Sequence, residues 1–330
     1  MVTNKNLYRA RNTKNDEFYT TLECIEKELS HYKKHFFNKV VLCNCDDPYE
    51  SNFCKYFADN FLEIGLKKLI CTSYFSSKVS EKNNKKGTVL ILEKDSFNCD
   101  GERKPIKSCT KTLEGDGDFR SDECLSFLDE CDIVVTNPPF SLFKEFFGEI
   151  MKRHKNFLII GNQNALTYKE IFPYIQKNLV WTGYQFGEMK FRVPDDSEPR
   201  ATRFWIDENG QKWRSLGNAM WLTNLDIPKR HKALDLTKTY KPELYPKYDL
   251  FDAINVRTIN DIPYDYDGIM GVPITIINRL NGKQFEIIGE ANHGSDNEFD
   301  LFKPTINGAQ VFKRILIKAK RKWKIISIEY

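Results

Sequence analysis

The sequence predicts an α/β fold built on an open, largely parallel sheet. Residues 39–45 form a short apolar run that is followed by an acidic turn and a helical pattern, and residues 132–150 again give an apolar run, a polar turn and a helical pattern. Short β-branched runs that alternate with amphipathic segments are typical of parallel sheets. From Ile227 onward this alternation is lost, and Pro, Tyr, Asp and Asn become frequent. The pattern therefore indicates one α/β domain over residues 1–226 and a loop-rich region over 227–330.

Composition excludes several classes of protein. The chain has 330 residues, enough for one large or two moderate domains, and a formal net charge of +4. Its apolar runs fall short of the roughly 20 residues that a membrane-spanning helix needs, and its start lacks the apolar core of a secretory signal. All nine cysteines lie between Cys24 and Cys131, an odd number that indicates reduced thiols in a cytoplasm. Cys43 and Cys45 have no histidine pair at a zinc-binding spacing, so we expect no metal.

The N-terminal part supplies the first expected elements. Phe18, Tyr19 and Thr20 precede a helical pattern over residues 21–32, and residues 39–45 are expected to form the first parallel strand. A simple helix entry with a hydrophobic contact is the alternative role for the aromatic pair.

Asp46 and Asp47 follow this strand directly, ahead of a helix expected over 49–64. Two carboxylates suit a positively charged ligand, whereas the glycine-rich cradle that phosphates need is absent from this turn. Capping of the helix is the alternative role for one of the two.

Two further strands are expected on either side of the polar stretch 76–86, over residues 68–74 and 87–93. Residues 115–119 read Gly-Asp-Gly-Asp-Phe and predict a tight acidic turn. Without its neighbours this turn could be a plain glycine turn.

The strand expected at 133–135 ends in a rigid polar turn, Asn137-Pro138-Pro139-Phe140. Because the prolines hold the backbone, the Asn137 side-chain oxygen and the Pro138 carbonyl form a preset pair of acceptors. A planar amino group has two hydrogens to donate and fits that pair, which leaves its nitrogen lone pair aimed away from the acceptors. Phe140 offers a flat face for an aromatic base, worth about 1–3 kcal/mol per base. The turn is therefore the candidate catalytic site.

The rest of the chain supplies the later elements. We expect a helix over 167–177 and strands over the ranges 156–160, 179–186, 219–225, 285–288 and 314–317. Residues 187–218 would form an excursion on the substrate side. Phe191 within it is either a second wall for an extruded base or a core aromatic.

Asn137-Pro138-Pro139-Phe140 resembles the catalytic motif of S-adenosylmethionine-dependent amino methyltransferases, chiefly those that methylate N6 of adenine in DNA. Further segments together resemble the EcoRI modification methylase family in particular, and they span most of the chain. These segments are residues 16–20 (DEFYT), 40–48 (VVLCNCDDP), 115–121 (GDGDFRS), 141–145 (SLFKE), 221–226 (WLTNLD) and 270–275 (MGVPIT).

The resemblance implies a class I methyltransferase fold: a Rossmann-like, seven-stranded sheet with its last strand inserted antiparallel, followed by a target-recognition region. It implies S-adenosyl-L-methionine as the cofactor. It also implies cofactor contacts for Phe18, Tyr19, Thr20, Asp46, Asp47, Asp118 and Phe119. Asp118 would accept from the cofactor's adenine amino group, and Phe119 would lie against that ring. In this fold an acidic residue at the end of the second strand usually binds the ribose hydroxyls of the cofactor. Residues 72–74 contain no acid, and we consider Glu93 as a substitute.

Basic residues near both ends of the chain indicate contact with phosphates. Residues 1–15 contain no acid, and residues 313–324 carry seven cations without an acid. A solvated face is the alternative for either run alone. The candidate contacts in the first run are Lys5, Arg9, Arg11 and Lys14.

We therefore expect an enzyme: a site-specific DNA methyltransferase that acts on the N6 amino group of a flipped adenine in double-stranded DNA. By resemblance, a companion restriction endonuclease would act on the same site without a physical complex, with a target such as GAATTC. Methylation of RNA or of a protein glutamine amide is one alternative, because Asn-Pro-Pro-aromatic turns serve planar nitrogens generally. A non-catalytic DNA-binding module is another, and the intact motifs argue against it.

Overall fold

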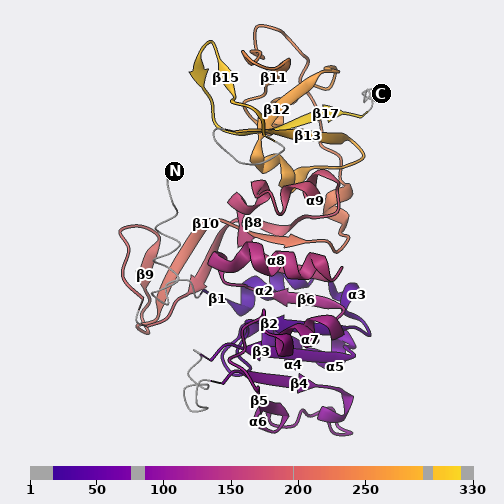
Figure 1. Ribbon diagram of the computed structural model, residues 1–330, viewed down its shortest axis with the longest axis vertical. Coiled ribbons are helices and arrows are strands. Elements are labelled where there is room, and N and C mark those ends of the chain that lie inside the picture. The colour runs from indigo at the N-terminus through magenta and orange to yellow at the C-terminus, as the bar shows by residue number, and fades with distance from the viewer. Residues whose placement is uncertain (1–17, 76–85, 196, 293–299, 321–330) are drawn as a thin grey trace, which may run out of the picture. The chain divides into compact units, whose positions relative to one another are not determined.

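The structure is a computed structural model that describes residues 18–75, 86–195, 197–292 and 300–320 (Figure 1). The described residues form two compact units. The first contains the chain up to Gln163 together with 183–225, and the second contains 164–182 together with the chain from Asp226 onward. The change of unit at Asp226 lies next to the predicted boundary, whereas the segment 164–182 belongs to the second unit although the sequence pattern assigned it to the first domain.

The first unit is built on a 10-stranded sheet. In spatial order its strands are β1 (Tyr19–Thr20), β8 (Trp181–Arg192), β10 (Lys212–Thr223), β7 (Asn156–Asn162), β6 (Ile133–Thr136), β2 (Val40–Asn44), β3 (Lys68–Ser73), β4 (Thr88–Leu92) and β5 (Thr110–Thr112), with β9 (Phe204–Ile206) paired to β10. The seven strands from β8 to β4 are those that the resemblance implied, and β1, β5 and β9 extend the sheet.

Four neighbouring strands, β7, β6, β2 and β3, run parallel. Strand β10 lies antiparallel to β7, as expected of the last strand in the chain to join the sheet, with Ala219 opposite Asn162. Strands β2 and β6 are buried along their whole length. Burial on both faces explains why these two strands read as continuous apolar runs rather than as alternating patterns.

Strand β4 runs antiparallel to β3, with Ser73 opposite Thr88. The two hydroxyl oxygens lie 2.6 Å apart in a hydrogen bond. A parallel neighbour would need a crossover connection of a dozen or more residues, usually a helix, to return the chain to the same edge. Because β4 is antiparallel, its last residue lies at the edge of the sheet where β3 begins.

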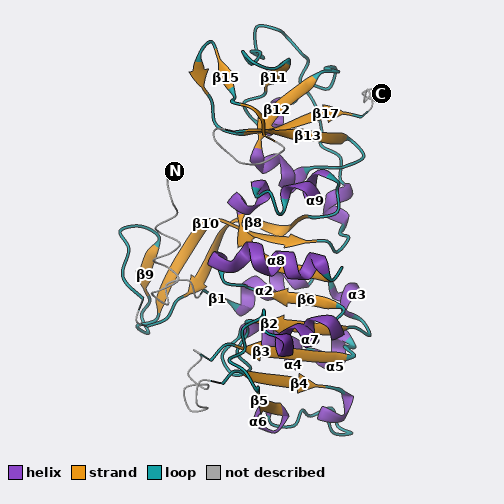
Figure 2. Ribbon diagram, viewed as in Figure 1, coloured by secondary structure: helices purple, strands orange, loops and turns teal. Residues whose placement is uncertain are grey.

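Helices flank this sheet, and Figure 2 shows them in purple against the strands. They are α2 (Leu22–Leu29), α3 (Lys33–Phe36), α4 (Asn52–Asp59), α5 (Phe61–Ile64), η2 (Lys94–Ser96), α6 (Ile106–Cys109), α7 (Asp122–Glu130), η3 (Phe140–Leu142) and α8 (Phe143–Lys152). Thr21, Ser51 and Ser121 cap α2, α4 and α7 by accepting a backbone amide hydrogen, the hydroxyl chemistry that N-caps favour.

The helix expected over 49–64 is broken at Asn60 into α4 and α5. Asn60 Nδ2 donates to Tyr56 O at 2.8 Å, so its side chain occupies a carbonyl that a continuing helix would use. Gly65 then ends α5 in the left-handed conformation at φ 71°.

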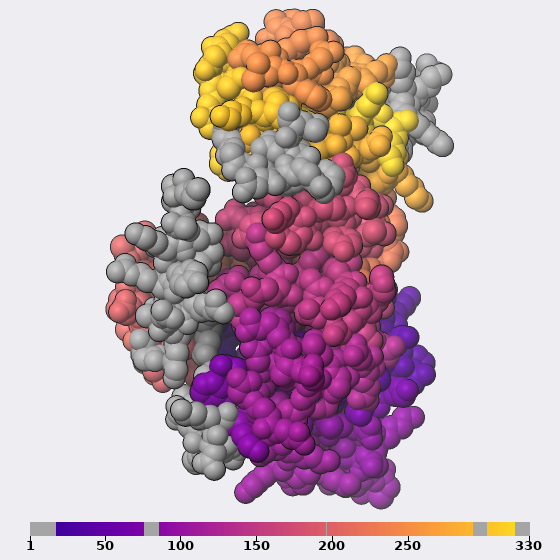
Figure 3. Space-filling view, viewed as in Figure 1, coloured from indigo at the N-terminus to yellow at the C-terminus, as the bar shows by residue number. Residues whose placement is uncertain are grey.

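Strands β8 and β10 have 12 residues each and are longer than the sequence predicted. Their far halves and the connection between them, residues 187–217, form what we call the arm, which Figure 3 shows in salmon at the side of the first unit. Fully buried Glu28 of α2 fixes the base of β8, because it accepts hydrogen bonds from the backbone amides of Tyr184 and Gln185 at 2.7 and 2.8 Å.

The second unit has its own 5-stranded sheet in the order β11-β12-β17-β13-β14 and a separate two-stranded hairpin. Its strands are β11 (Ala253–Asn255), β12 (Ile269–Pro273), β13 (Phe285–Ala291), β14 (Asp300–Phe302), β15 (Thr305–Ile306), β16 (Ala309–Gln310) and β17 (Arg314–Ala319). Its helical turns are η4 (Gln163–Thr167), α9 (Phe172–Gln176), η5 (Pro228–His231), η6 (Ile259–Asp261) and η7 (Ile274–Arg279). The strands predicted at 285–288 and 314–317 are present as β13 and β17. The helix predicted over 167–177 is reduced to α9.

Candidate active site

The tips of β2 and β6 meet at the carboxyl edge of the parallel part of the sheet. Leu42 pairs with Val134 in parallel register, which places Asn44 beside Thr136. Thr136 Oγ1 lies 2.7 Å from Asn44 O and donates a hydrogen bond to it. The loop that follows β2 and the turn that follows β6 are therefore held side by side, at the edge where open α/β sheets bind ligands.

Asn137, the first residue after β6, has one end of its amide fixed and the other end open. Its Nδ2 donates to Phe18 O at 2.6 Å. Its Oδ1 is buried and has no hydrogen-bond partner. Buried polar atoms are nearly always paired, and leaving one unpaired costs about 1–3 kcal/mol. Because Nδ2 anchors the amide, Oδ1 is an oriented acceptor that is available to a donor group of a ligand.

The residues after Asn137 are rigid and aromatic. Pro138 is buried, and Pro139 has φ −56° and ψ 124° at the entry to η3. The half-buried Phe140 ring stacks on Phe18 with ring centroids 5.4 Å apart and an angle of 28° between the planes. The turn therefore presents an open amide oxygen next to an aromatic pair.

Phe191 lies behind this pair as part of the core. Its side chain is 0% exposed and meets the Phe18 ring edge to face, with centroids 5.5 Å apart. It pairs with Thr20 where β1 joins β8. Of the two roles that the sequence suggested, burial favours the core aromatic, which supports Phe18 against Phe140 and offers no open face to a base.

The loop after β2 contains a residue in the left-handed backbone conformation that glycine usually adopts, although that residue is a cysteine. Cys45 has φ 87°, in the left-handed region that favours glycine. The backbone amides of Cys45 and Asp46 both donate to Thr72 O, at 3.0 and 2.9 Å. Such a conformation costs of order 1 kcal/mol or more for a residue with a side chain. It folds the acidic loop over the end of β3.

Asp47 combines a capping role with an unused acceptor. Its Oδ1 accepts from the backbone amides of Tyr49 and Glu50 at 2.8 and 3.2 Å. Its Oδ2 is buried without a hydrogen-bond partner. One oxygen of Asp47 therefore has the capping role that the sequence suggested as the alternative for this pair of carboxylates. The other oxygen is available to a ligand.

Asp46 is engaged through both oxygens. Oδ1 accepts from Ser51 Oγ at 2.6 Å, and Oδ2 lies 2.6 Å from Thr136 Oγ1. Burial of the carboxyl group raises the pKa of Asp46 to about 7, although the bond from Ser51 acts in the opposite direction. Asp46 therefore ties the acidic loop to the tip of β6, whereas Asp47 carries the open oxygen.

Four buried side-chain oxygens without a hydrogen-bond partner lie on these segments: Thr20 Oγ1, Asn44 Oδ1, Asp47 Oδ2 and Asn137 Oδ1. Asn52 Nδ2 donates to Thr20 O at 2.8 Å, which joins β1 to the start of α4. All four oxygens can accept hydrogen bonds. A ligand rich in N–H and O–H groups and bearing positive charge satisfies such a set, whereas a phosphate brings only acceptors and negative charge.

The acidic turn 115–119 packs backbone to backbone on the end of β3. Gly117 has φ 81°, and a Cβ atom built on it would lie 2.2 Å from Ser73 O. Phe75 N donates to Asp116 O at 2.9 Å, and Gly87 N donates to Gly115 O at 3.0 Å. Only glycine fits at Gly117, so the turn is fixed at the same edge of the sheet as the loop after β2.

Asp118 is held in a fork by Arg120, whose Nε and Nη2 donate to Asp118 Oδ1 and Oδ2 at 2.9 and 2.6 Å. Asp118 Oδ1 also accepts from the backbone amide of Arg120 at 2.9 Å, so the turn holds this carboxylate in a fixed orientation. Phe119 is 6% exposed and meets Phe146 of α8 edge to face, with centroids 5.1 Å apart. Phe119 therefore anchors the turn and leaves little of its ring for contact with a cofactor.

Replacement of Gly117 by alanine is expected to reduce the free energy of unfolding by at least about 2 kcal/mol, because it combines a left-handed backbone with a steric clash. Gly148 is the matched control: it is an exposed residue within α8, and a Cβ there meets nothing within 4 Å. Gly148→Ala should leave stability unchanged or raise it by about 0.5–1 kcal/mol. Urea unfolding of both variants measures the difference, and equal stability would show that the turn does not pack on β3 as described.

Glu93, considered for the ribose, lies at the opposite edge of the sheet. Because β4 is antiparallel to β3, Leu92 pairs with Leu69, and Glu93 forms an ion pair with Lys68 at 3.2 Å. The five steps from one end of β3 to the other span roughly 16 Å. That assignment was wrong, because the direction of β4 carries its last residue away from the carboxyl edge.

Some predictions fall outside the described residues. Lys5, Arg9, Arg11 and Lys14 lie there, as does the end of the basic run 313–324. Within the described part of the chain, no group of three or more His, Cys, Asp or Glu side chains could hold a metal ion. None of the helices in that part is long and apolar enough to cross a membrane.

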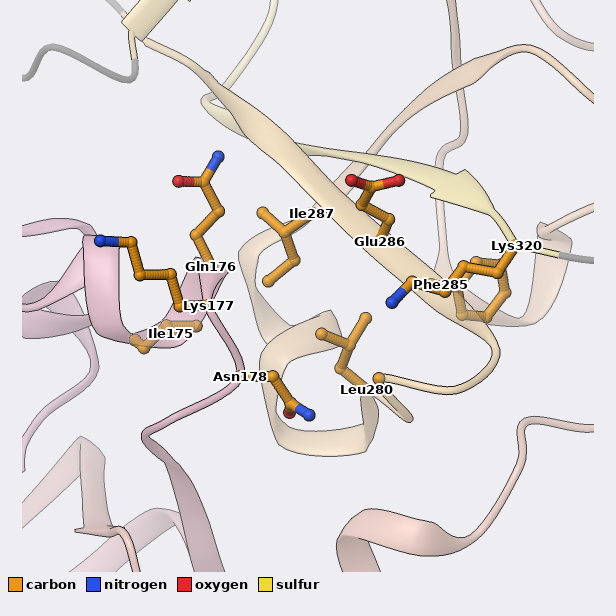
Figure 4. Close-up of a pocket in the computed structure, with 10 residues that line it drawn as sticks. Ile175, Gln176, Lys177, Asn178, Leu280, Phe285, Glu286, Ile287 and Lys320 are labelled. Carbon is orange, nitrogen blue, oxygen red and sulfur yellow. The ribbon is translucent and has the colours of Figure 1, made fainter.

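A separate pocket of about 230 Å³ lies within the second unit, between α9 and β13 (Figure 4). Lys177 and Lys320 bring positive charge to its rim and Glu286 brings negative charge. Gln176, which also lines it, already donates to Ile288 O at 3.0 Å. None of the residues predicted for catalysis or cofactor binding lines this pocket.

Sequence reasoning missed three contributors to the site. Thr136 joins the tips of β2 and β6, and a polar residue at the end of an apolar strand was the available signal. The guanidinium carbon of Arg214 lies 5.1 Å from the centroid of Phe18, and that of Arg192 lies 5.8 Å from the centroid of Tyr19. Both arginines come from the arm, and no local pattern marks which of its cations reach the aromatic residues.

The strand order, the location at the carboxyl edge and the Asn-Pro-Pro-Phe turn together define a Rossmann-like α/β methyltransferase. Comparison with known proteins gives the family. A family model described as adenine-specific methyltransferase EcoRI matches residues 6–328. The chain belongs to this family, as the resemblance of its motifs predicted.

Three relatives have been named as type II methyltransferases. M.EcoRI of Escherichia coli is 47% identical over 97% of this chain and 98% of its own length. M.MgeORF184P of Mycoplasma genitalium is 40% identical over 85% of this chain and 84% of its own. M.MpnI of Mycoplasma pneumoniae is 38% identical over 85% and 84% of the two chains.

Proposed function

We propose that this enzyme is a site-specific DNA methyltransferase that moves a methyl group from S-adenosylmethionine to the N6 amino group of adenine. The observation that carries the proposal is the buried, unpaired Oδ1 of Asn137, an acceptor fixed in direction by the hydrogen bond from Nδ2 to Phe18 O. An exocyclic amino group supplies the donor that this oxygen lacks. Membership of an adenine-specific methyltransferase family supports adenine as the target base.

Asn137 and Pro138 prepare the amino group for attack. Asn137 Oδ1 accepts one of its hydrogens and the Pro138 carbonyl accepts the other, which draws the nitrogen lone pair out of conjugation with the ring. The bound cofactor supplies the electrophilic methyl group. Asn137 acts as an acceptor only. The nitrogen would carry a positive charge once the methyl group is transferred and would lose its excess proton to water, so the step does not require a strong base.

The remaining open acceptors fit S-adenosylmethionine, which carries a sulfonium, an ammonium group, ribose hydroxyls and an adenine amino group. We assign Asp47 Oδ2, Asn44 Oδ1 and Thr20 Oγ1 to the cofactor on the basis of their unmet acceptor capacity. By resemblance to the family, Asp118 would accept from the adenine amino group of the cofactor. Tyr19, which shares the segment of Phe18 and Thr20, would help to enclose the methionine part.

The target adenine must leave the duplex stack to reach Asn137, at a cost of a few kcal/mol. Phe140 would stack on the flipped base, with Phe18 supporting it from the other side of the aromatic pair. Arg192 and Arg214 of the arm lie on Tyr19 and Phe18 and would place positive charge beside that base. These placements support contact of the arm, within residues 187–218, with the DNA backbone.

Phe140→Ala is expected to weaken methyl transfer by about 5- to 150-fold, the range that corresponds to a stack worth about 1–3 kcal/mol. The cofactor dissociation constant should stay within about twofold, because Phe140 acts on the base. Phe140→Tyr keeps the ring and should retain activity. A single-turnover assay on duplex DNA measures both variants, and an alanine variant as fast as the tyrosine variant would show that the ring does not hold the base.

We propose that the first domain, residues 1–226, binds the cofactor and carries catalysis, and that residues 227–330 recognise the target sequence. The assigned catalytic and cofactor residues all come from the first domain. The second unit brings its own sheet and a loop-rich surface, a suitable scaffold for contacts with base edges. Lys5, Arg9, Arg11 and Lys14 would add phosphate contacts.

We further propose that methylation protects cytoplasmic DNA from a companion restriction endonuclease that acts on the same sequence. The type II class of the named relatives supports this role. The two enzymes need share only a DNA sequence, so the proposal requires no physical complex between them.

An acceptor competition separates DNA from the other planar nitrogens that such a turn could serve. Equal masses of unmethylated DNA, RNA and a glutamine-rich protein are mixed with the enzyme and S-adenosylmethionine that carries a labelled methyl group. We expect the label in DNA alone. Label in RNA or protein would replace the DNA assignment, and absence of transfer despite DNA binding would leave a non-catalytic binding module.

A further inference from the structure

Methyl transfer as proposed does not use Asp46, but this residue lies next to both the acidic loop assigned to the cofactor and the catalytic turn. One neighbour in the chain, Asp47, carries an open oxygen assigned to the cofactor. On the other side, Asp46 Oδ2 contacts Thr136, the residue before Asn137. Asp46 is 6% exposed and Thr136 is 0% exposed, so bulk water cannot readily reorganise around this contact.

The hydrogens around Asp46 can be counted. The Ser51 hydroxyl accepts from Phe53 N at 3.1 Å and donates its single hydrogen to Asp46 Oδ1. The Thr136 hydroxyl also has a single hydrogen, yet its oxygen lies 2.7 Å from Asn44 O and 2.6 Å from Asp46 Oδ2. Both short contacts are hydrogen bonds at once only if Asp46 Oδ2 carries a proton and donates it to Thr136 Oγ1. The chain Asp46 O–H to Thr136 O–H to Asn44 O then uses every hydrogen.

The surroundings of Asp46 agree with a neutral carboxyl group. Burial raises its pKa to about 7, and the negative charge of Asp47 on the same loop acts in the same direction. Its titratable neighbours are Cys43 of β2 and Cys45 of the loop that follows, and both interact with Asp46. Asp118 of the acidic turn and Cys124 of α7 interact in turn with Cys45. These neighbours are acids or thiols, and their charged forms are negative.

We propose that Asp46 carries a proton in the cofactor-free enzyme and loses it to the solvent when the cationic S-adenosylmethionine binds beside it. This inference rests on the cofactor assigned under the proposed function. The Asp46 O–H bond breaks, the proton passes to the buffer, and the carboxylate left behind faces the positive charge. Thr136 then turns its single hydrogen from Asn44 O to Asp46 Oδ2, so occupancy of the cofactor site is relayed to the residue that precedes Asn137.

Removal of the methyl group converts the sulfonium into a neutral thioether, so the product has one positive charge less than the cofactor. Asp46 would then regain its proton and restore the link between Thr136 and Asn44. The enzyme would therefore hold S-adenosylmethionine more tightly than S-adenosylhomocysteine by an amount that depends on pH. Asp46 is in this sense a positioning residue that senses the charge of the cofactor.

Asp46→Asn is a close mimic of the protonated residue. Its Oδ1 can accept from Ser51, and its Nδ2 can donate to Thr136 as the carboxyl proton does. The variant should therefore fold but cannot ionise. Asp132→Asn is the matched control, because Asp132 precedes β6 at the opposite edge, where its Oδ2 accepts from Val40 N at 2.8 Å.

The first readout is calorimetric titration at pH 6 in buffers of different ionisation enthalpy, which counts the protons released on binding. Wild type should release roughly 0.8 proton per S-adenosylmethionine, for a pKa that falls from about 7 to below about 5. S-adenosylhomocysteine should release fewer than half as many. Asp46→Asn should release none and bind S-adenosylmethionine several-fold more weakly, whereas Asp132→Asn should match wild type. Binding of S-adenosylmethionine without proton release, or with equal release from Asp46→Asn, overturns the inference and leaves the proposed function intact.

The second readout needs no cofactor. A raised pKa in the folded state means that the stability contributed by the Asp46 proton is complete below the unfolded pKa near 4 and is lost as pH rises through about 7. The melting temperature of Asp46→Asn should therefore rise relative to that of wild type as the pH increases from 5 to 8. A constant difference over that range overturns the protonated state of Asp46 directly. Failure of S-adenosylmethionine to bind wild type at all would instead refute the proposed cofactor.

Discussion

Replacement of Asn137 by alanine is expected to lower the rate of methyl transfer by at least about a thousandfold, because it removes an acceptor that acts on charge developing in the transition state. Affinity for DNA and for S-adenosylmethionine should stay within about threefold, since the assigned cofactor and phosphate contacts come from other residues. Single-turnover transfer to duplex DNA, together with separate binding titrations, measures the two effects.

The matched control for this variant is Asn162→Ala, at the tip of the neighbouring strand β7. Asn162 Oδ1 accepts from Asn218 Nδ2 at 3.0 Å, so this side chain already has a partner. Its replacement should change the transfer rate by less than about fivefold. A rate for Asn137→Ala within tenfold of wild type would remove Asn137 from the catalytic role, whatever the control shows.

Asp47→Asn is the second change with a large expected effect. The variant keeps an oxygen to cap the amides of Tyr49 and Glu50, but it places a buried NH₂ group where the structure has an open acceptor. Loss of a charged hydrogen bond corresponds to about 1.5–3 kcal/mol, so the dissociation constant for S-adenosylmethionine should rise by about 10- to 150-fold. S-adenosylhomocysteine should weaken by a similar factor, which distinguishes Asp47 from the charge-sensing role inferred for Asp46.

Glu50→Gln provides the control for charge. Glu50 is exposed and lies in the same loop, so its replacement alters net charge equally without placing a donor against a buried acceptor. We expect less than a twofold change in cofactor affinity. If Asp47→Asn binds S-adenosylmethionine as wild type does, the open oxygen of Asp47 is not a cofactor contact.

The parts of the site that could be predicted are local in sequence. Residues 133–150 contain a buried strand, a proline turn and an amphipathic helix whose buried faces follow from spacing alone, and the structure has these elements as β6, η3 and α8. The buried side chains of α8 are Phe143, Phe146, Phe147 and Ile150. The place of the polar residues at the strand tips could be predicted in the same way, because the chain leaves the apolar core where each strand ends.

The parts that could not be predicted depend on contacts between distant residues. The bond from Asn137 to Phe18 joins residues 119 apart in the chain, and no local pattern shows that the amide nitrogen is engaged while the oxygen has no partner. The apolar run of β4 does not show its direction relative to β3, so the sequence alone could not show that Glu93 lies at the opposite edge of the sheet. Burial of Phe191 likewise depends on β1 pairing with β8.

Element lengths were misjudged where side chains compete with the backbone and where an alternating pattern was not followed past a glycine. Asn60 interrupts a helix by bonding the carbonyl of Tyr56. Pro173 near the start of α9 restricts where that helix can begin, and it was a signal that the sequence offered. The far part of β8, residues 188–192, does alternate polar and apolar residues, with Met189 and Phe191 buried, so the signal of a longer strand was present beyond Gly187 and was not used.

The most direct test of the central claim is nucleoside analysis of unmethylated plasmid DNA after incubation with the purified enzyme and S-adenosylmethionine, with the modified positions mapped by sequencing. The two hydrogen-bond acceptors for an amino group at Asn137 and Pro138, in a chain of the adenine-specific family, predict N6-methyladenine confined to one short sequence. Methylation at a ring carbon, methylation of cytosine, or N6-methyladenine scattered without sequence preference would contradict it.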